Sequence, residues 1–426
     1  MEVLTLLGTM VALAAIGLPL VFAILAACLA TLLIFRPGLP LEVLPQLFVN
    51  GMDRPVLLAI VFFFLAGELM NRGGITRRII DFASALVGHV RGGLGQVNVV
   101  SSIFFSGITG SAVADTAAIG TVMIPSMVRK GYAPGFAAAV TQTSSVIGPI
   151  IPPSIPMIVY AVMAEVSVGQ MFLGGILPGL VIGAVLMLVV LLISVRRGYP
   201  VERRASAGDV VRTGLDAAVA LGTPLIIVGG ILGGVFTATE AGAVAVLYSL
   251  LAGALFYREL DLPGLWAAIV RAAEGTATVL VILGASSIFA WIVADLRVHQ
   301  AAASLLFALG REPWLVLLAI NLLVLVVGLF MDPLAALVIL VPILLPAAAE
   351  IGVDPVHFGV MIVINLMIGL TTPPVGYLIY LSADIAEVPP EVVIRESLPF
   401  LGALLVALGI CAYVPAVTLA LPSLLR

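Results

Sequence analysis

Long apolar runs separated by short polar joins recur along the whole chain. A helix needs about 20 predominantly apolar residues to cross a bilayer. On this criterion we predict membrane spans at 4–35, 55–70, 171–195, 216–236, 240–257, 276–293 and 396–420. The first run is longer than one span needs and contains Gly17, Leu18 and Pro19, so it is either one tilted, kinked helix or two short helices.

Four further apolar blocks, each interrupted by proline, glycine and hydroxyl residues, lack the regularity of a single span. These blocks are 93–128, 134–165, 314–350 and 355–388, and their interruptions read SGITGSAVAD (106–115), SSVIGPIIPPS (144–154), GLFMDP (328–333) and NLMIGLTTPPVG (365–376). Proline removes a backbone donor and clashes with the preceding helical turn. At membrane depth, backbone freed in this way is tolerated only where protein or an aqueous cavity satisfies it. We therefore predict a hairpin turn in the first and third blocks and an unwound helix in the second and fourth.

The two pairs of blocks are related by an internal repeat. A shift of 221 residues aligns 107–178 with 328–399 without a gap, and five prolines of each segment then coincide. Roughly one coincidence is expected by chance from the prolines present, so a repeat is the better interpretation.

Basic residues predict the orientation. With 14 of the 19 on the cytoplasmic side, the positive-inside rule is satisfied. The cytoplasmic joins are then 71–92, 129–133, 196–215, 258–275 and 389–395. The block 93–128 enters and leaves on this side, whereas 314–350 opens on the outside. The sequence thus predicts inverted repeats, the architecture of many secondary transporters.

These boundaries give an all-α polytopic membrane protein in which each repeat holds a re-entrant helical hairpin and a broken helix. We predict scaffold or connecting helices at 1–92, 166–313 and 389–426, and a transport module made by 93–165 and 314–388.

Composition supports a multi-pass membrane protein and narrows its chemistry. The chain is 62% hydrophobic and 10% charged, with a mean hydropathy of +1.26. The net charge of −4 gives no reason to expect nucleic acid, and no phosphate-binding loop surrounds the single lysine, Lys130. Cys28 and Cys411 lie in apolar runs, which fits packing rather than a disulfide. Direct use of ATP is therefore not indicated.

The interrupted segments are the candidate binding sites. Freed carbonyls and Ser or Thr hydroxyls form a largely neutral oxygen cage that suits Na⁺, and half-helix N-termini favour an anionic substrate group. Asp115 and Asp332 are the acids of the two hairpins, and each either binds a ligand or caps a helix. Asn321 and Asn365 could each bridge helices. Asn365 is the better candidate for a binding site, because it adjoins an interruption.

With these motifs the chain resembles the large membrane subunit of tripartite ATP-independent periplasmic (TRAP) transporters. The resemblance rests on residues 66–102 and 106–161, and on GLFMDPLAALVILVPILLP and NLMIGLTTPPVGYLIY. It implies an elevator-type member of the ion-transporter superfamily in a bacterial or archaeal inner membrane, with a cytoplasmic N-terminus. It also implies Na⁺-coupled import of an organic acid of the C4-dicarboxylate, keto acid, sugar acid or sialic acid class. The implied partners are a soluble periplasmic binding protein and a small four-helix membrane subunit.

The resemblance also implies positions for two Na⁺ ions and for the substrate. The first cation would bind near Ser106, Gly107, Ser111, Ser145, Gly148 and Pro149. The second would bind near Gly328, Asp332, Gly369, Thr371 and Thr372. The substrate candidates are Thr109, Asp115, Ser154, Asn365 and Val375.

Two other classes of function are compatible with parts of this pattern. A stand-alone Na⁺-coupled carboxylate symporter or antiporter would share this architecture but need no binding protein. An intramembrane enzyme would need a base or a carboxylate dyad at membrane depth, and no predicted span holds a histidine. The sequence therefore favours a carrier over an enzyme, and does not name the acid.

Overall fold

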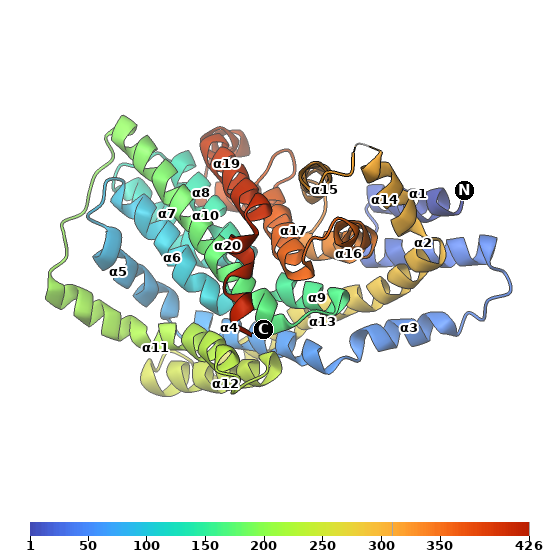
Figure 1. Ribbon diagram of the computed structural model, residues 1–426. Helices are drawn as coiled ribbons and strands as arrows, with labels where there is room; N and C mark the ends of the chain where they lie inside the picture. The colour runs from blue at the N-terminus through green and yellow to red at the C-terminus, as the bar shows by residue number, and fades with distance from the viewer. Residues whose placement is uncertain (309, 426) are drawn as a thin grey trace.

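The computed structural model describes residues 1–308 and 310–425, and every regular element in this part of the chain is a helix (Figure 1). Residues 309 and 426, which fall within the predicted ranges 166–313 and 389–426, lie outside the described residues. The all-α fold expected from the sequence is confirmed.

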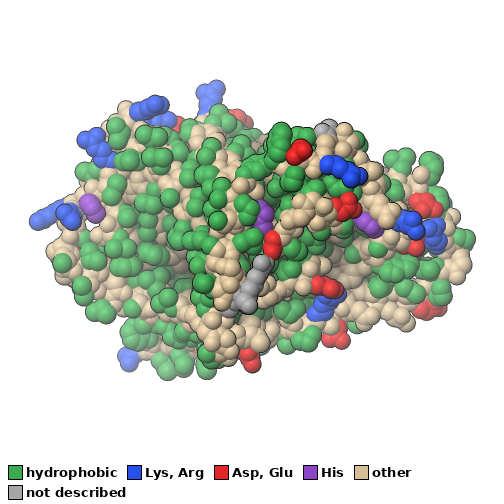
Figure 2. Space-filling model, in the orientation of Figure 1, with side chains coloured by type: hydrophobic (Ala, Val, Ile, Leu, Met, Phe, Trp, Pro, Cys, Tyr) green, Lys and Arg blue, Asp and Glu red, His purple; other side chains and the backbone are tan. Residues whose placement is uncertain are grey.

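Seven helical stretches in the described residues are long and apolar enough to cross a membrane. They are Pro55–Arg72, which includes α4 (Leu58–Arg72), α10 (Val168–Arg197), α11 (Ala207–Leu232), Ala238–Phe256, which includes α12 (Ala238–Leu251), α13 (Leu262–Asp295), α16 (Pro333–Glu350) and α19 (Pro390–Tyr413). Six of them coincide with predicted spans; the seventh, α16, lies in the predicted block 314–350. Large apolar side chains such as Leu188 and Leu192 of α10 are more than half exposed, and Figure 2 shows apolar side chains spread over the visible face. Such a surface fits contact with lipid.

The first apolar run consists of two short helices rather than one kinked span. α1 (Glu2–Ala15) and α2 (Leu20–Phe35) pack against each other, and the Arg36 guanidinium lies 3.0 Å from the Glu2 carboxylate. Residues 2 and 36 therefore lie at the same end of this helical pair. The cytoplasmic N-terminus stays a prediction. It conflicts with the external position that the charge-based orientation gives Arg36, because the two residues lie on the same side.

Three helices lie outside the predicted spans and blocks, within the ranges predicted for scaffold or connecting helices: α3 (Val43–Met52), α5 (Ile75–Val87) and α14 (Val298–Phe307). In addition, α13 begins 14 residues before the predicted start of its span at 276. Pro263 and the Asp261 carboxylate, which accepts from the Gly264 N–H at 2.8 Å, begin this helix in a polar stretch. Hydropathy alone does not detect such starts.

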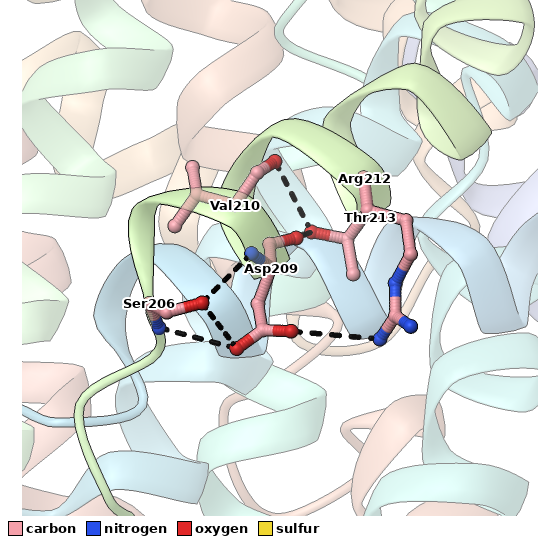
Figure 3. Close-up of polar contacts among 5 residues, drawn as sticks. All are labelled: Ser206, Asp209, Val210, Arg212 and Thr213. Carbon is pink, nitrogen blue, oxygen red and sulfur yellow. Dashed lines mark hydrogen bonds and ion pairs between the residues drawn. The ribbon is translucent and has the colours of Figure 1, made fainter.

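The N-terminus of α11 is fixed by a reciprocal cap (Figure 3). The Asp209 N–H donates to the Ser206 hydroxyl at 3.1 Å, and the Ser206 N–H donates to the Asp209 carboxylate at 3.2 Å. Arg212 lies 3.6 Å from the same carboxylate. This capping box satisfies backbone donors that the first helical turn leaves free.

The four irregular blocks fold as the interruptions predict. In the first half, α6 (Gly93–Thr109) and α7 (Ala112–Arg129) are joined by residues 110–111, here called tip 1. Helix α8 (Pro134–Ser144) is separated from α9 (Ile155–Ala164) by residues 145–154, here called break 1.

The second half has the same order of elements. Residues 329–332, called tip 2, join α15 (Pro313–Gly328) to α16, and residues 370–376, called break 2, separate α17 (Pro355–Gly369) from α18 (Tyr377–Ala386). The Pro152–Pro153 and Pro373–Pro374 peptide bonds are both cis. The short helix α20 (Pro415–Leu419) follows α19 near the end of the chain.

The two halves pack across each other. In the first half, α9 packs on α16 and α17 of the second, whereas α18 of the second half packs on α7 and α8 of the first. Each broken helix thus places its second segment against the hairpin of the other half, and both tips and both breaks meet inside one bundle.

Candidate functional site

One cavity of about 500 Å³ lies where the two tips and the two breaks meet. Tip 1 contributes Gly110 and Ser111, and tip 2 contributes all four of its residues. Break 1 contributes Pro149, while break 2 contributes Leu370, Val375 and Gly376. The sequence predicted each of these segments separately, and the tertiary structure brings them to a single site.

Four helices begin at this cavity. The first residues of α7, α9, α16 and α18 all belong to its wall: Ala112, Ile155, Pro333 and Tyr377. A helix N-terminus carries roughly half a positive charge, from backbone N–H groups without helical partners. Four such ends around one cavity create a positive potential without a basic side chain, which favours an anion.

The hydroxyl and carboxyl groups at three of these ends are helix caps. The Ser111 hydroxyl accepts from the Ala114 N–H at 3.4 Å, and the Ser154 hydroxyl accepts from the Met157 N–H at 3.2 Å. Asp332 accepts from the N–H groups of Leu334 and Ala335, at 2.9 and 3.3 Å. Of the two roles considered for Asp332, the structure shows capping, and its exposed side chain also lines the cavity. Cation binding by Asp332 stays a prediction.

The candidates for the second cation meet at a close backbone contact between α15 and α17. A Cβ atom at Gly369 would lie 2.4 Å from the Gly328 carbonyl oxygen, so only glycine fits there. Beside it, the hydroxyls of Thr371 and Thr372 both donate to the Ile368 carbonyl, at 3.0 and 2.7 Å. Carbonyl and hydroxyl oxygens therefore gather at this contact. Cation binding there stays a prediction.

The candidates for the first cation lie near a contact between break 1 and tip 1 in the first half. A Cβ atom at Gly148 would lie 3.4 Å from the Ser111 carbonyl oxygen, so break 1 touches tip 1 there. The Ser145 hydroxyl donates to the Thr141 carbonyl at 2.8 Å, and the Ser106 hydroxyl to the Ile103 carbonyl at 2.6 Å.

The remaining two candidates also lie here. Gly107 packs on Pro224 of α11, while Pro149 accepts from the Ser154 hydroxyl. Both sets of cation candidates thus lie where a tip and a break approach each other. This region of each half is called its tip-to-break contact, and in the second half it includes the adjoining Gly328 and Gly369.

Asp115 is the most unusual group of this region. Its side chain is fully buried in α7, and neither carboxylate oxygen has a hydrogen-bond partner within 3.5 Å in the described residues. The hydroxyls of Ser102 and Ser145 lie next to it. Ser111, not Asp115, caps α7. A fully buried carboxyl group is stable only when it is protonated or when a positive charge compensates it. Cation binding beside Asp115 stays a prediction.

The five substrate candidates occupy different positions. Val375 lines the cavity and is 45% exposed, whereas Thr109 and Ser154 each directly precede a lining residue. Asp115 and Asn365 are fully buried and do not belong to the wall. All five assignments stay predictions.

Asn365 also shows the alternative role that was considered for it. Its amide donates to both the backbone carbonyl and the side-chain oxygen of Asn321, each at 2.8 Å, and so links α17 to α15.

Sequence reasoning did not find the contribution of α4. Phe64 of this helix lines the cavity, and Gly67 packs on the backbone next to tip 1, where its Cβ atom would lie 3.2 Å from the Ile108 carbonyl oxygen. Neither residue interrupts an apolar run, so no local signal distinguishes it. Among the described residues of the wall, Phe64 is the one contributed by a helix outside the four interrupted blocks.

Interrupted helices that surround a cavity within an all-helical membrane bundle define the class of membrane transporters. Residues 7–417 match the family model described as "Tripartite ATP-independent periplasmic transporter, DctM component". The chain therefore belongs to the DctM family of TRAP transporter large permeases, a family of transporters and not of enzymes.

Two relatives and one solved structure place the chain further. It is 41% identical over 408 residues to the sialic acid TRAP transporter large permease SiaM of Vibrio cholerae, covering 96% of this chain and 95% of that protein. It is 39% identical over 393 residues to the C4-dicarboxylate TRAP transporter large permease DctM of Pseudomonas aeruginosa, covering 92% of each. The crystal structure of the Alcanivorax borkumensis YdaH transporter superimposes with a TM-score of 0.60 at 16% identity, covering 87% of this chain and 86% of that one. This last likeness concerns the fold alone.

Proposed function

We propose that this chain is the large permease of a binding-protein-dependent importer that couples uptake of an organic acid to the Na⁺ gradient. The observation that carries the proposal is the convergence of four helix N-termini on one cavity, with an oxygen-rich tip-to-break contact in each half. The relatives above are named for sialic acid and C4-dicarboxylate transport, and both substrates are carboxylates.

In the proposed mechanism, Na⁺ binds at the two tip-to-break contacts and orders the chain around the cavity. One Na⁺ neutralises the partnerless Asp115 carboxylate and draws on the Ser145 hydroxyl and nearby carbonyls. The other uses the carbonyls and hydroxyls around Gly328 and Gly369. Substrate affinity then depends on bound Na⁺, which is the coupling that symport requires.

The two pairs of interrupted blocks form inverted repeats that move together against a scaffold, an elevator-type mechanism. Reciprocal packing supports the symmetry, because α9 on α16 and α17 mirrors α18 on α7 and α8. The shift of 221 residues exchanges these pairs. Phe64 would belong to the stationary side of the cavity.

The inverted topology predicts opposite exposure of Arg129 and Glu350, which are equivalent under the repeat and both exposed. In intact cells, an impermeant thiol reagent should label Glu350→Cys from outside, and Arg129→Cys only after permeabilisation. The unmodified chain is the control, because Cys28 and Cys411 are both buried. Labelling of both variants from one side would rule out inversion.

The tripartite requirement is tested by reconstitution. Proteoliposomes containing this chain and a small membrane subunit should take up the acid only when the soluble binding protein is added. Membership in a family of tripartite transporters supports two partners, the small membrane subunit and the soluble binding protein. Undiminished uptake without the binding protein would instead establish a stand-alone symporter or antiporter.

A further inference from the structure

The wall of the central cavity is largely apolar. Among the described residues that line it, only Ser111, Asp332 and Tyr377 have polar side chains. Many of the large apolar side chains of the wall come from α4, tip 2, α17 and break 2: Phe64, Phe330, Met331, Met367, Leu370 and Val375. Phe330 is 62% exposed although it lies between helices, so its ring is available to a ligand.

Charge is just as unevenly distributed. No lysine, arginine or histidine occurs among the described residues of the wall, and the single charged side chain is the Asp332 carboxylate. One carboxylate of a ligand can be held at the helix N-termini. No side chain of the described wall offers a positive charge to a second carboxylate, which would lie beside apolar side chains or the negative Asp332 unless it also reached a helix N-terminus.

This wall discriminates among organic acids by the cost of dehydration. A ligand hydroxyl or carboxylate that loses water without gaining a partner weakens binding by roughly tenfold or more per group. An apolar group placed on the same wall strengthens binding instead, because apolar surface leaves water. The cavity should therefore bind polyhydroxylated and doubly charged acids more weakly than acids with an apolar body.

We propose that the substrate is a monocarboxylate with an apolar body, such as a branched-chain or aromatic 2-oxo acid, and not a C4-dicarboxylate or a sugar acid. The proposal rests on the proposed function, since it assigns the transported acid to this cavity. Its carboxylate lies at the converging helix ends, and its hydrocarbon part contacts Phe64, Phe330 and Val375.

Thermal unfolding of the full-length purified chain tests the proposal without the selectivity of a binding protein. The probes are 4-methyl-2-oxopentanoate and phenylpyruvate, compared with succinate and N-acetylneuraminate, each in NaCl and in KCl. The two apolar acids should raise Tm by about 2–5 °C in NaCl and the two polar acids should not, because a ligand stabilises only the state that it binds.

The other outcomes are distinct. Stabilisation by succinate or N-acetylneuraminate equal to or greater than that by the apolar acids would overturn the substrate class and leave the proposed function standing. No stabilisation by any of the four acids in NaCl would contradict both.

A nearly isosteric variant tests whether the apolar acids bind in this cavity. Val375→Thr replaces a wall methyl group by a hydroxyl and should weaken binding of the apolar acids roughly tenfold, judged from the concentration dependence of Tm. Phe330→Tyr offers a second test on tip 2. The matched control is Val201→Thr, since Val201 is exposed in the connection between α10 and α11 and does not line the cavity. Equal affinities in the unmodified chain, Val375→Thr and Phe330→Tyr would place the ligand elsewhere.

Discussion

Gly369→Ala is expected to abolish most of the Na⁺-dependent uptake while the chain still folds. The new methyl group would lie 2.4 Å from the carbonyl oxygen of Gly328 and 2.6 Å from its carbonyl carbon. Both are backbone atoms, so α15 and α17 must separate where the second Na⁺ is proposed to bind. Overpacking of this kind costs about 1–3 kcal/mol. If the ion-free state escapes the strain, Na⁺ affinity falls by about 5- to 150-fold.

Gly409→Ala is the matched control. Gly409 lies in α19, and a Cβ atom there would have no atom within 4 Å. Uptake measured against external Na⁺ concentration should be unchanged in Gly409→Ala and strongly shifted in Gly369→Ala. Indistinguishable Na⁺ dependence in the two variants would remove the second cation from this contact.

Asp115→Asn is expected to weaken Na⁺ binding by about a hundredfold without unfolding the chain. The substitution keeps the shape of a fully buried side chain and removes its charge. Loss of one partner from a buried ion pair costs about 3–5 kcal/mol. Even half of this free energy, when lost from Na⁺ binding, lowers the affinity for Na⁺ by more than about tenfold. Without a bound cation, the buried carboxyl group either takes up a proton or stays uncompensated, so the same change would leave the stability of the chain unchanged or raise it.

The dependence of this change in Tm on Na⁺ separates a chain with a cation beside Asp115 from a chain without one. Thermal unfolding in NaCl should show a lower Tm for Asp115→Asn than for the unmodified chain, and in KCl, where no Na⁺ binds, an equal or higher Tm. Asp209→Asn is the control, because an amide can still accept from the Ser206 N–H in the exposed cap of α11 (Figure 3). A higher Tm for Asp115→Asn in both salts would exclude a cation beside Asp115.

Local sequence patterns predicted the interrupted helices well, because their causes are local. Clusters of proline, glycine and hydroxyl residues, such as those of 144–154 and 328–333, favour helix ends. Single prolines such as Pro178 and Pro224 lie inside helices instead. The structure places helix ends at both stretches and at their counterparts. The long apolar spans were equally predictable, since hydropathy and length determine them.

Features that depend on tertiary packing could not be predicted. Phe64 belongs to an ordinary apolar span, and only the fold brings it to the cavity. The convergence of four helix N-termini depends on packing between the halves, which no local pattern records. α5 was missed because a short helix with a polar face, here including Arg77 and Asp81, does not resemble a membrane span.

The most direct test of Na⁺-coupled import by this chain is uptake into proteoliposomes under an imposed Na⁺ gradient. The reconstituted complex, supplied with its binding protein, should accumulate the acid above the external concentration. Accumulation should collapse when an ionophore dissipates the Na⁺ gradient, and should not occur when K⁺ replaces Na⁺. Accumulation that persists without a Na⁺ gradient would contradict the proposed coupling.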